Sequence, residues 1–304
     1  MAFLPMLKKL RYVAALGMLA ASLAPIGGCT DEEPPPETST APVSQCGGGA
    51  PKSFLISTLG FTRIDETTGK VKGFNLDGVV SDGTDEASCF KKDFVSFSGE
   101  KGVDNQLASL IPDVEAILGD AVDGLIQGAI NNGGLLIFLT VERADNLQND
   151  DCVDLTVTTV LGKPTLGTNG VIEAYQTFDP DPEGEVSHAT GGKIVNGELT
   201  IGPFELAIPI AIFDVAFTIH VHDALFKLKL TGEDGVAKEG LLGGGVVPQE
   251  ILDGVAPGAG VDQYIPVLTL VLNGSTDLEI DEEGTCQQVS AALQITAVEA
   301  FLRP

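Results

Sequence analysis

The stretch "ELTIGPFELAIPIAIFDVAFTIHVHDALFKLKL", Glu198 to Leu230, decides the fold because apolar and polar residues alternate along much of it. Successive side chains of a strand point to opposite faces, so this period of two predicts long, half-buried β-strands. From Val215 to Val221 the apolar side chains of the alternation fall on odd numbers, and from Ala224 to Leu230 they fall on even numbers. A strand cannot change phase without an inserted residue or a turn, so we expect the backbone to bulge or reverse near His222 and Asp223.

Shorter runs of the same kind lie on both sides of this stretch. Each is rich in β-branched or alternating apolar residues and is bounded by glycine or acidic turns such as "DPDPEGE" at residues 179–185. We expect strands at residues 53–62, 70–75, 90–97, 135–142, 153–161, 171–178, 265–272 and 289–298. Many short strands with glycine turns predict a mainly β (α+β) fold, either an antiparallel β-sandwich or an open barrel.

One region has clear helical spacing, and it begins near Asp104, a residue type favoured at helix N-caps. Pro112 predicts a kink or the start of a second helix, and residues 131–134 supply the end. Residues 240–255, "GLLGGGVVPQEILDGV", predict a glycine loop followed by a short helix from about Pro248. We therefore expect one or two helices to cover the sheet.

The first 28 residues have the features of a secretion signal. Three basic residues within residues 8–11 precede 14 mostly apolar residues, fewer than the ~20 that a membrane-crossing helix needs. The quartet Ile26-Gly27-Gly28-Cys29 follows, and it resembles the lipobox of bacterial lipoproteins. The resemblance implies that Cys29 is acylated and becomes the first residue of the mature protein. The alternative is a plain secreted protein in which Cys29 is an ordinary thiol.

Residues 29–50 follow as a stretch rich in acid, proline and threonine. Such a composition cannot bury a core, so we expect a lipidated cysteine followed by a disordered tether. The 17 residues from Cys29 to Cys46 span at most ~50 Å at ~3.1 Å per residue. Residues 51–304 are expected to form a single β-rich domain. In lipoproteins of Gram-negative bacteria an Asp after the lipidated Cys retains the protein at the inner membrane, so Thr30 implies the outer membrane.

The charge of the chain restricts its partners. Removing residues 1–28 removes three positive charges and no negative ones, so a net charge of -26 becomes -29. Such a protein repels nucleic acid and anionic lipid surfaces, and its natural small partners are cations. We expect membrane attachment through the lipid anchor only, and the sequence identifies no protein partner.

Four cysteines remain after Cys29, and they are Cys46, Cys89, Cys152 and Cys286. An even number in an exported protein predicts two disulfides, and three connectivities are open. No C-x-x-C pair is present, which disfavours a zinc ribbon or a thioredoxin-type redox site.

The histidines suggest one metal site. His220 and His222 stand at i and i+2, so on a strand they share a face and could share a metal, with His188 or Asp223 as a third ligand. The same face carries further polar residues, so a solvated surface is the competing interpretation. A site of this kind would make the chain a metal-dependent, hydrolase-like enzyme.

Two acidic turns suggest calcium, the one cofactor that the sequence favours. Residues 277–288, "DLEIDEEGTCQQ", begin with carboxylates at alternate positions as an EF-hand loop does, but they have Glu282 in place of the glycine and Gln288 in place of the closing glutamate. The alternative is a pair of solvated acidic turns. The proposed oxygen ligands are Asp277, Glu279 and Asp281 in one turn and Asp77, Asp82 and Asp85 in the other.

The sequence contains no G-x-S-x-G, H-E-x-x-H or Walker motif. Three short stretches resemble parts of uncharacterised exported lipoproteins of Gram-negative bacteria: "GFNLDG" at 73–78, "GVDNQ" at 102–106 and "CQQVSAALQITAV" at 286–298. That resemblance implies no activity. We therefore expect an envelope-anchored lipoprotein that works as a non-catalytic binding or structural module, and the metal-dependent enzyme is the alternative.

Overall fold

The computed structural model describes residues 46–118, 122–212, 215–230, 236–255 and 265–304. They belong to one compact unit, Ala41–Pro304. The predicted signal peptide, Cys29 and the tether up to residue 45 lie outside the described residues. Among the helices that the structure describes, none has the length and apolar character needed to cross a membrane.

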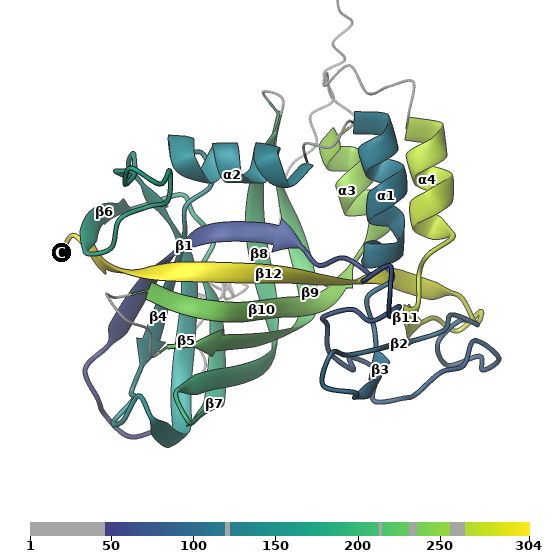
Figure 1. Cartoon of the computed structure of the whole chain (residues 1–304), viewed down its shortest axis with the longest axis horizontal. Helices are drawn as coiled ribbons and strands as arrows, with labels where there is room; N and C mark the ends of the chain where they lie inside the picture. The colour runs from purple at the N-terminus through teal and green to yellow at the C-terminus, as the bar shows by residue number, and fades with distance from the viewer. Residues whose placement is uncertain (1–45, 119–121, 213–214, 231–235, 256–264) are drawn as a thin grey trace, which may run out of the picture. The chain divides into compact units, whose positions relative to one another are not determined.

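The described chain is mainly β, with four helices (Figure 1). The strands are β1 (Lys52–Phe61), β2 (Phe94–Val95), β3 (Lys101–Val103), β4 (Ile137–Glu142), β5 (Asn149–Leu161), β6 (Gln176–Pro180), β7 (Ser187–Val195), β8 (Glu198–Ile212), β9 (Val215–Lys229), β10 (Val236–Val246), β11 (Leu278–Ile280) and β12 (Cys286–Leu302). The helices are α1 (Leu107–Leu118), α2 (Val122–Asn132), α3 (Pro248–Val255) and α4 (Ile265–Asn273).

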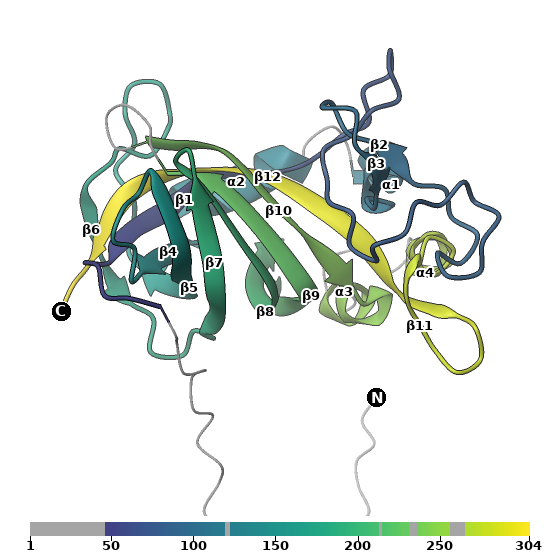
Figure 2. The same cartoon turned by 90° about the horizontal axis from the view of Figure 1, so that it is seen from below.

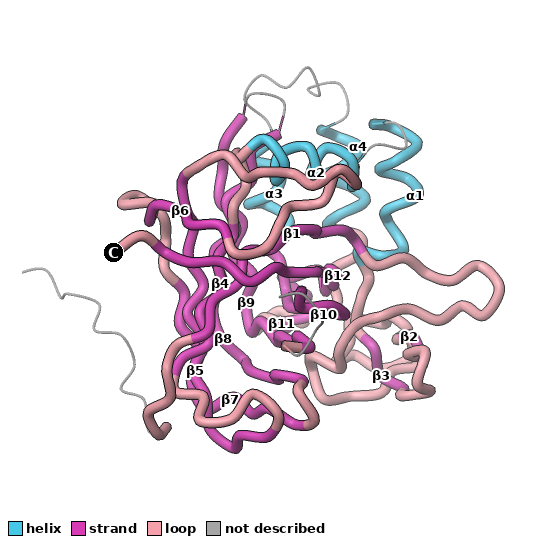
Figure 3. Tube along the Cα trace, turned by 60° about the vertical axis from the view of Figure 1, so that its left-hand side comes forward, coloured by secondary structure: helices cyan, strands magenta, loops and turns pink. Residues whose placement is uncertain are grey.

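Eight strands hydrogen-bond in a closed ring, in the order β1-β4-β5-β7-β8-β9-β10-β12 and back to β1, and every pair in the ring is antiparallel (Figure 3). β6 is an addition that pairs antiparallel with β5 and parallel with β12. The predicted fold class is confirmed. Of the architectures expected, the pairing is that of a barrel, and the ring is closed rather than open because β1 pairs with both β4 and β12.

The ring encloses the main hydrophobic core. Phe54, Phe138 and Phe226 from three different strands are each at most 2% exposed. β10, whose glycines were expected to form a loop, packs tightly into this ring. A Cβ at Gly240 would lie 2.2 Å from Cγ1 of Ile295, so this strand approaches its neighbours more closely than a larger residue would allow.

The helices differ from the sequence prediction in number and in one position. The single region predicted from Asp104 is two helices, with Pro112 inside α1 rather than at the start of the second. Residues 265–272, predicted as a strand, form α4 instead. Periodicity cannot distinguish a short apolar strand from a short apolar helix. A small core decides the outcome, because Leu272 of α4 is buried against Leu110 of α1 and Leu252 of α3.

Two strands predicted next to β1 are replaced by irregular backbone. Residues 70–75 form only one bridge, between Phe74 and Asp104, and residues 90–97 contain the two-residue β2 and one bridge, from Lys92 to Asp82. β1 pairs with β4 and β12, so contacts distant in sequence take the hydrogen bonds expected from a local hairpin. The strand predicted at 171–178 is likewise displaced to β6.

The predicted change of phase is confirmed as a bulge in β9. On β8, Leu206 pairs with Val221 and Phe204 pairs with Ala224, so β9 contains one residue more than its neighbour there. β10 shows the same offset. Asp223 absorbs the extra residue with φ of 49°, a left-handed conformation in which aspartate is better tolerated than most residues.

Candidate functional site

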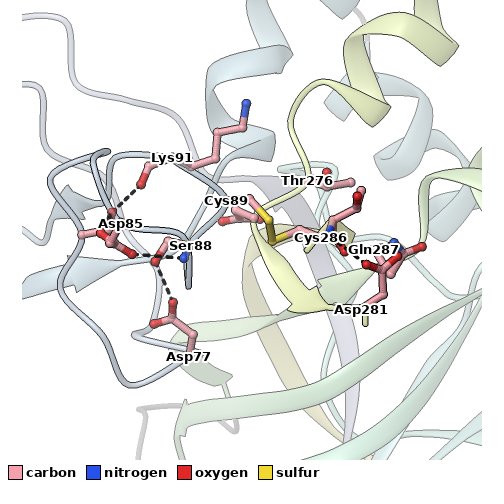
Figure 4. The surroundings of a disulfide bond; sticks show 12 residues. Asp77, Asp85, Ser88, Cys89, Lys91, Thr276, Asp281, Cys286 and Gln287 are labelled. Carbon is pink, nitrogen blue, oxygen red and sulfur yellow. Dashed lines mark hydrogen bonds between the residues drawn. A yellow bond between two sulfur atoms is a disulfide. The ribbon is translucent and has the colours of Figure 1, made fainter. Parts of the chain in front are cut away.

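Four aspartates meet where the segment between β1 and α1 packs against β11 and β12. We call Asp77, Asp93, Asp104 and Asp277 the acidic junction. The Cys89–Cys286 disulfide crosses this region, with its Cα atoms 6.0 Å apart, and joins the segment to the first residue of β12 (Figure 4). A covalent bridge therefore fixes the two halves of the junction next to each other.

Asp104 and Asp277 are almost completely buried, at 2% and 3% exposure. The Asp104 carboxyl accepts hydrogen bonds from the backbone N–H groups of Leu76 (2.6 Å) and Asp77 (3.3 Å). Asp277 accepts from the N–H (2.7 Å) and the hydroxyl (2.5 Å) of Ser290. Each aspartate thus holds a loop or strand in place through its oxygens.

Burial changes the acidity of these groups. Loss of water raises the pKa of Asp104 to about 8 and that of Asp277 to about 7, and the nearby charges of Asp77 and Asp93 act in the same direction. Burial also raises the pKa of Asp93. The hydrogen bonds that each carboxyl accepts oppose this change without cancelling it. Asp104 and Asp277 are therefore the carboxyls of the acidic junction whose pKa values lie near neutral pH.

A chain of hydrogen bonds connects the acidic junction to Gln106, the residue directly before α1. Ser290 Oγ, which donates to Asp277, accepts from the backbone N–H of Gln106 at 2.8 Å. The Gln106 side chain donates to the carbonyl of Lys92 at 3.0 Å. A general acid or base must lie within hydrogen-bond reach of a substrate, and the buried carboxyls are enclosed by these partners. The buried carboxyls are therefore arranged to hold protons and backbone groups in place within the fold.

The first proposed calcium turn does not gather its ligands. Asp77 accepts from the N–H of Val79 at 2.8 Å and from the hydroxyl of Ser88 at 3.1 Å, while Asp82 caps its own turn through Thr84 at 3.1 Å. Asp85 accepts from the Ser81 hydroxyl at 2.5 Å, which lowers the pKa of Asp85. These oxygens are used by the backbone and hydroxyls of the loop itself.

The proposed ligands of the second calcium turn also have separate surroundings. Asp277 is buried in the acidic junction, while Asp281 accepts from the N–H groups of Glu283 and Thr285 at 2.9 Å each. Glu279 lines a hollow of about 60 Å³ together with Asp77, Asp223 and Gln288. The hollow is therefore lined by one proposed ligand from each calcium turn and one from the histidine site, and it contains no complete set of proposed ligands.

The three histidines of the predicted metal site each contact different side chains. His220 lies with Nδ1 3.3 Å from Glu250 and Nε2 3.6 Å from Glu185, so its two carboxylates are on opposite sides of the ring. His222 Nδ1 lies 2.8 Å from Glu205, and His188 Nδ1 lies 3.1 Å from the Thr156 hydroxyl. Within the residues that the structure describes, no three His, Cys, Asp or Glu side chains could hold a metal ion together.

The four predicted disulfide cysteines form two bridges, Cys46–Cys152 and Cys89–Cys286. The predicted number of disulfides is confirmed, and one of the three open connectivities is selected. Cys286 is the first residue of β12, and Cys152 lies inside β5.

Sequence reasoning missed Asp93, Asp104 and Ser290 as members of a site. Asp104 was assigned to a helix cap, but α1 begins at Leu107, and Asn105 Oδ1 accepts from the N–H of Ala108 at 3.3 Å. No local pattern marks a carboxyl that is buried by residues distant in sequence. The nearest available signal was the acidic residue that directly follows Val103 in "GVDNQ".

Comparison with known proteins gives no match: no family model, no curated protein and no solved structure is significantly similar to this chain.

Proposed function

We propose that this chain is an exported lipoprotein, anchored to the bacterial cell envelope through Cys29, that works as a non-catalytic binding or structural module. The observation that supports this most directly is the use of the cysteines. The sequence has five, and the two disulfides use four of them with one another. Cys29 belongs to neither bridge, and it stands directly after the lipobox-like Ile26-Gly27-Gly28.

Disulfides also fit the proposed compartment. They form and persist in oxidising environments such as the bacterial periplasm and the cell surface. Thr30 after the acylated cysteine favours the outer membrane by the retention rule described above. Several acyl chains on one cysteine give stable attachment, at ~0.8 kcal/mol for each buried CH₂.

The absence of a catalytic role is proposed from the described polar groups. The buried carboxyls of the acidic junction are enclosed by Leu76, Gln106 and Ser290, which leaves no approach for a substrate. The alternative of a metal-dependent enzyme gains no support from His220, whose two carboxylate partners lie on opposite sides of its ring.

Mass spectrometry of the mature N-terminus from a Gram-negative host tests the anchoring. We expect the chain to begin at Cys29 with acyl chains on its sulfur and amine, and to fractionate with the outer membrane. A Cys29→Ala variant should lose the modification and leave the membrane fraction. The matched control is the double variant Cys89→Ser/Cys286→Ser, which should keep the anchor. An unmodified thiol at Cys29, or a mature chain that begins elsewhere, would contradict the proposal.

A further inference from the structure

β6 lies beside the C-terminal end of β12 (Figure 2), and several apolar side chains in and next to these two strands are exposed. Tyr175 is 54% exposed and Phe301 is 46% exposed, and their rings stack with centroids 6.4 Å apart. Leu161, Leu166 and Val171 are exposed in the same region, by 38% to 48%. We call Leu161, Leu166, Val171, Tyr175 and Phe301 the β6 apolar patch.

Strand pairing places Phe301 and Leu161 on one surface. Phe301 pairs with Thr177 of β6, and Leu161 pairs with Asp179 two residues further along β6. Side chains two apart on a strand share a face, so Phe301 and Leu161 lie on the same side of β6. Leu166 and Val171 belong to the connection between β5 and β6.

The backbone at Tyr175, whose ring is exposed, has a strained conformation. Tyr175 has φ of 64°, a left-handed conformation that is unusual for a bulky residue. Its N–H donates to the carbonyl of Glu299 at 2.5 Å, which fixes this geometry at the edge of β12. Strain of this kind persists only where the surroundings impose it, and it is often found at functional positions.

The charges beside the patch are paired. Arg303 lies 2.6 Å from Asp179, and the Lys52 amine forms an ion pair with Glu299. These four charges cancel in pairs, whereas Glu173 before β6 and Asp181 and Glu183 in the turn after it keep the surroundings acidic. The patch therefore suits a zwitterionic lipid surface, which does not repel these carboxylates as an anionic surface would.

We propose that the β6 apolar patch inserts into the headgroup boundary of a lipid bilayer, as a second membrane contact beside the acylated Cys29. This inference rests on the proposed function. Six residues separate Cys46 from Lys52, a distance of at most ~20 Å, and the Lys52 side chain reaches Glu299, two residues before Phe301. The tether before Cys46 adds at most ~50 Å, so the anchor keeps the patch within reach of the bilayer. Tyrosine and phenylalanine suit the boundary between acyl chains and headgroups.

A second copy of this chain is the competing occupant. The five side chains together expose on the order of 500 Å², whereas each partner of a stable protein complex buries about 800 Å². The patch is too small to hold a dimer by itself, but it is large enough to insert two rings and their aliphatic neighbours into lipid.

The lack of tryptophan in the chain allows a sharp test. A Tyr175→Trp variant of the acylated protein carries one reporter at the patch, and a Leu270→Trp variant carries one on α4. Leu270 is 75% exposed, and α4 lies at the opposite side of the described unit from β6 in both views (Figures 1 and 2). Both variants are reconstituted in phosphatidylcholine vesicles with brominated acyl chains.

We expect the reporter at position 175 to shift to the blue and to lose emission roughly twofold, while the reporter at position 270 keeps the emission it has in water. In the Cys29→Ser chain without acyl groups, Phe301→Ser should weaken vesicle binding about fivefold, because a half-exposed ring loses its burial in lipid.

The outcomes separate the two proposals. An acylated protein whose reporter at position 175 is quenched no more than the one at position 270 would overturn the patch but keep the anchor. A chain that lacks acylation but shows quenching at position 175 would overturn the anchor and keep the patch. Dimerisation in sedimentation that depends on Phe301 would assign the patch to a second copy and overturn the lipid contact.

Discussion

Asp104 and Asp277 are single residues that couple the stability of the protein to pH. The pKa of each is raised in the folded state above the ordinary value of 3.8. A raised pKa means that the folded state binds the proton more tightly, so its stabilising contribution is fully present below pH ~4 and is lost as the pH rises through the folded value. The lowered pKa values of Asp65, Asp85 and Asp150 act in the opposite direction, but these groups lie near the surface and contribute little.

The free energy of unfolding should therefore fall between pH 5 and pH 9. Each unit of pKa difference corresponds to ~1.4 kcal/mol, so Asp104 and Asp277 together should contribute a loss of several kcal/mol. Asp104→Asn removes the ionisation and keeps an oxygen for the N–H groups of Leu76 and Asp77. We expect this variant to be more stable than wild type at pH 9 and close to it at pH 5. Urea unfolding at both values checks this, with Asp82→Asn as an exposed control. An equal effect of Asp104→Asn at both pH values would contradict it.

Individual residues were predicted from the sequence only where a local pattern determined them. Asp223 was located because the phase of β9 changes there, and this change is visible in the residues on either side. Asp104 was misassigned because its burial depends on the loop before Asp93, whose Leu76 and Asp77 donate to its carboxyl. The pKa of a carboxyl depends on such distant neighbours, and one strand or turn does not contain them.

β10 is the element whose sequence was most misleading, because its glycines predicted a loop. Glycine weakens an isolated strand, but here it permits close approach of the neighbouring strands. Gly240 faces Ile295 and Leu228, and Gly243 lies under the Phe74 ring. The need for glycine is therefore a property of the packed ring.

Two glycine substitutions distinguish the effect of close packing in β10 from the effect of intrinsic helix propensity in α2. A Cβ at Gly240 would lie 2.2 Å from Ile295 Cγ1, so Gly240→Ala should destabilise the protein by about 1–3 kcal/mol through overpacking. A Cβ at Gly128, inside α2, meets nothing within 4 Å, so Gly128→Ala should stabilise it by up to about 1 kcal/mol. Thermal unfolding of both variants at one pH measures the difference. Similar shifts in the same direction would refute this account of β10.

Strands and helices were predicted best where the period was long and uniform. β8, β9 and β12 follow from their alternation, and α3 follows from Pro248 after a glycine run. α4 was predicted as a strand because nine mostly apolar residues satisfy either period. Its helical form depends on the contact of Leu272 with α1 and α3, which the local sequence does not contain.

At the scale of the whole described unit, closure of the ring and attachment of the loop segment are both non-local. β1 near the start and β12 near the end of the unit complete the ring, which no local pattern could specify. The same separation applies to the disulfides, which join cysteines 106 and 197 residues apart. Their number was predictable from composition, whereas their pairing required the fold.

Removing either bridge should cost about 4–5 kcal/mol of unfolding free energy, because loop entropy grows only with the logarithm of loop length. The local effects should differ, however. Cys89–Cys286 holds the segment that carries Asp77 and Asp93 against β12, so Cys89→Ser/Cys286→Ser should increase hydrogen exchange at residues 76–93 and spare the ring strands. Cys46→Ser/Cys152→Ser is the matched control, and it should leave residues 76–93 protected. Equal loss of protection at residues 76–93 in both variants, or a peptide map with different cysteine pairs, would show that the Cys89–Cys286 bridge does not hold the acidic junction together.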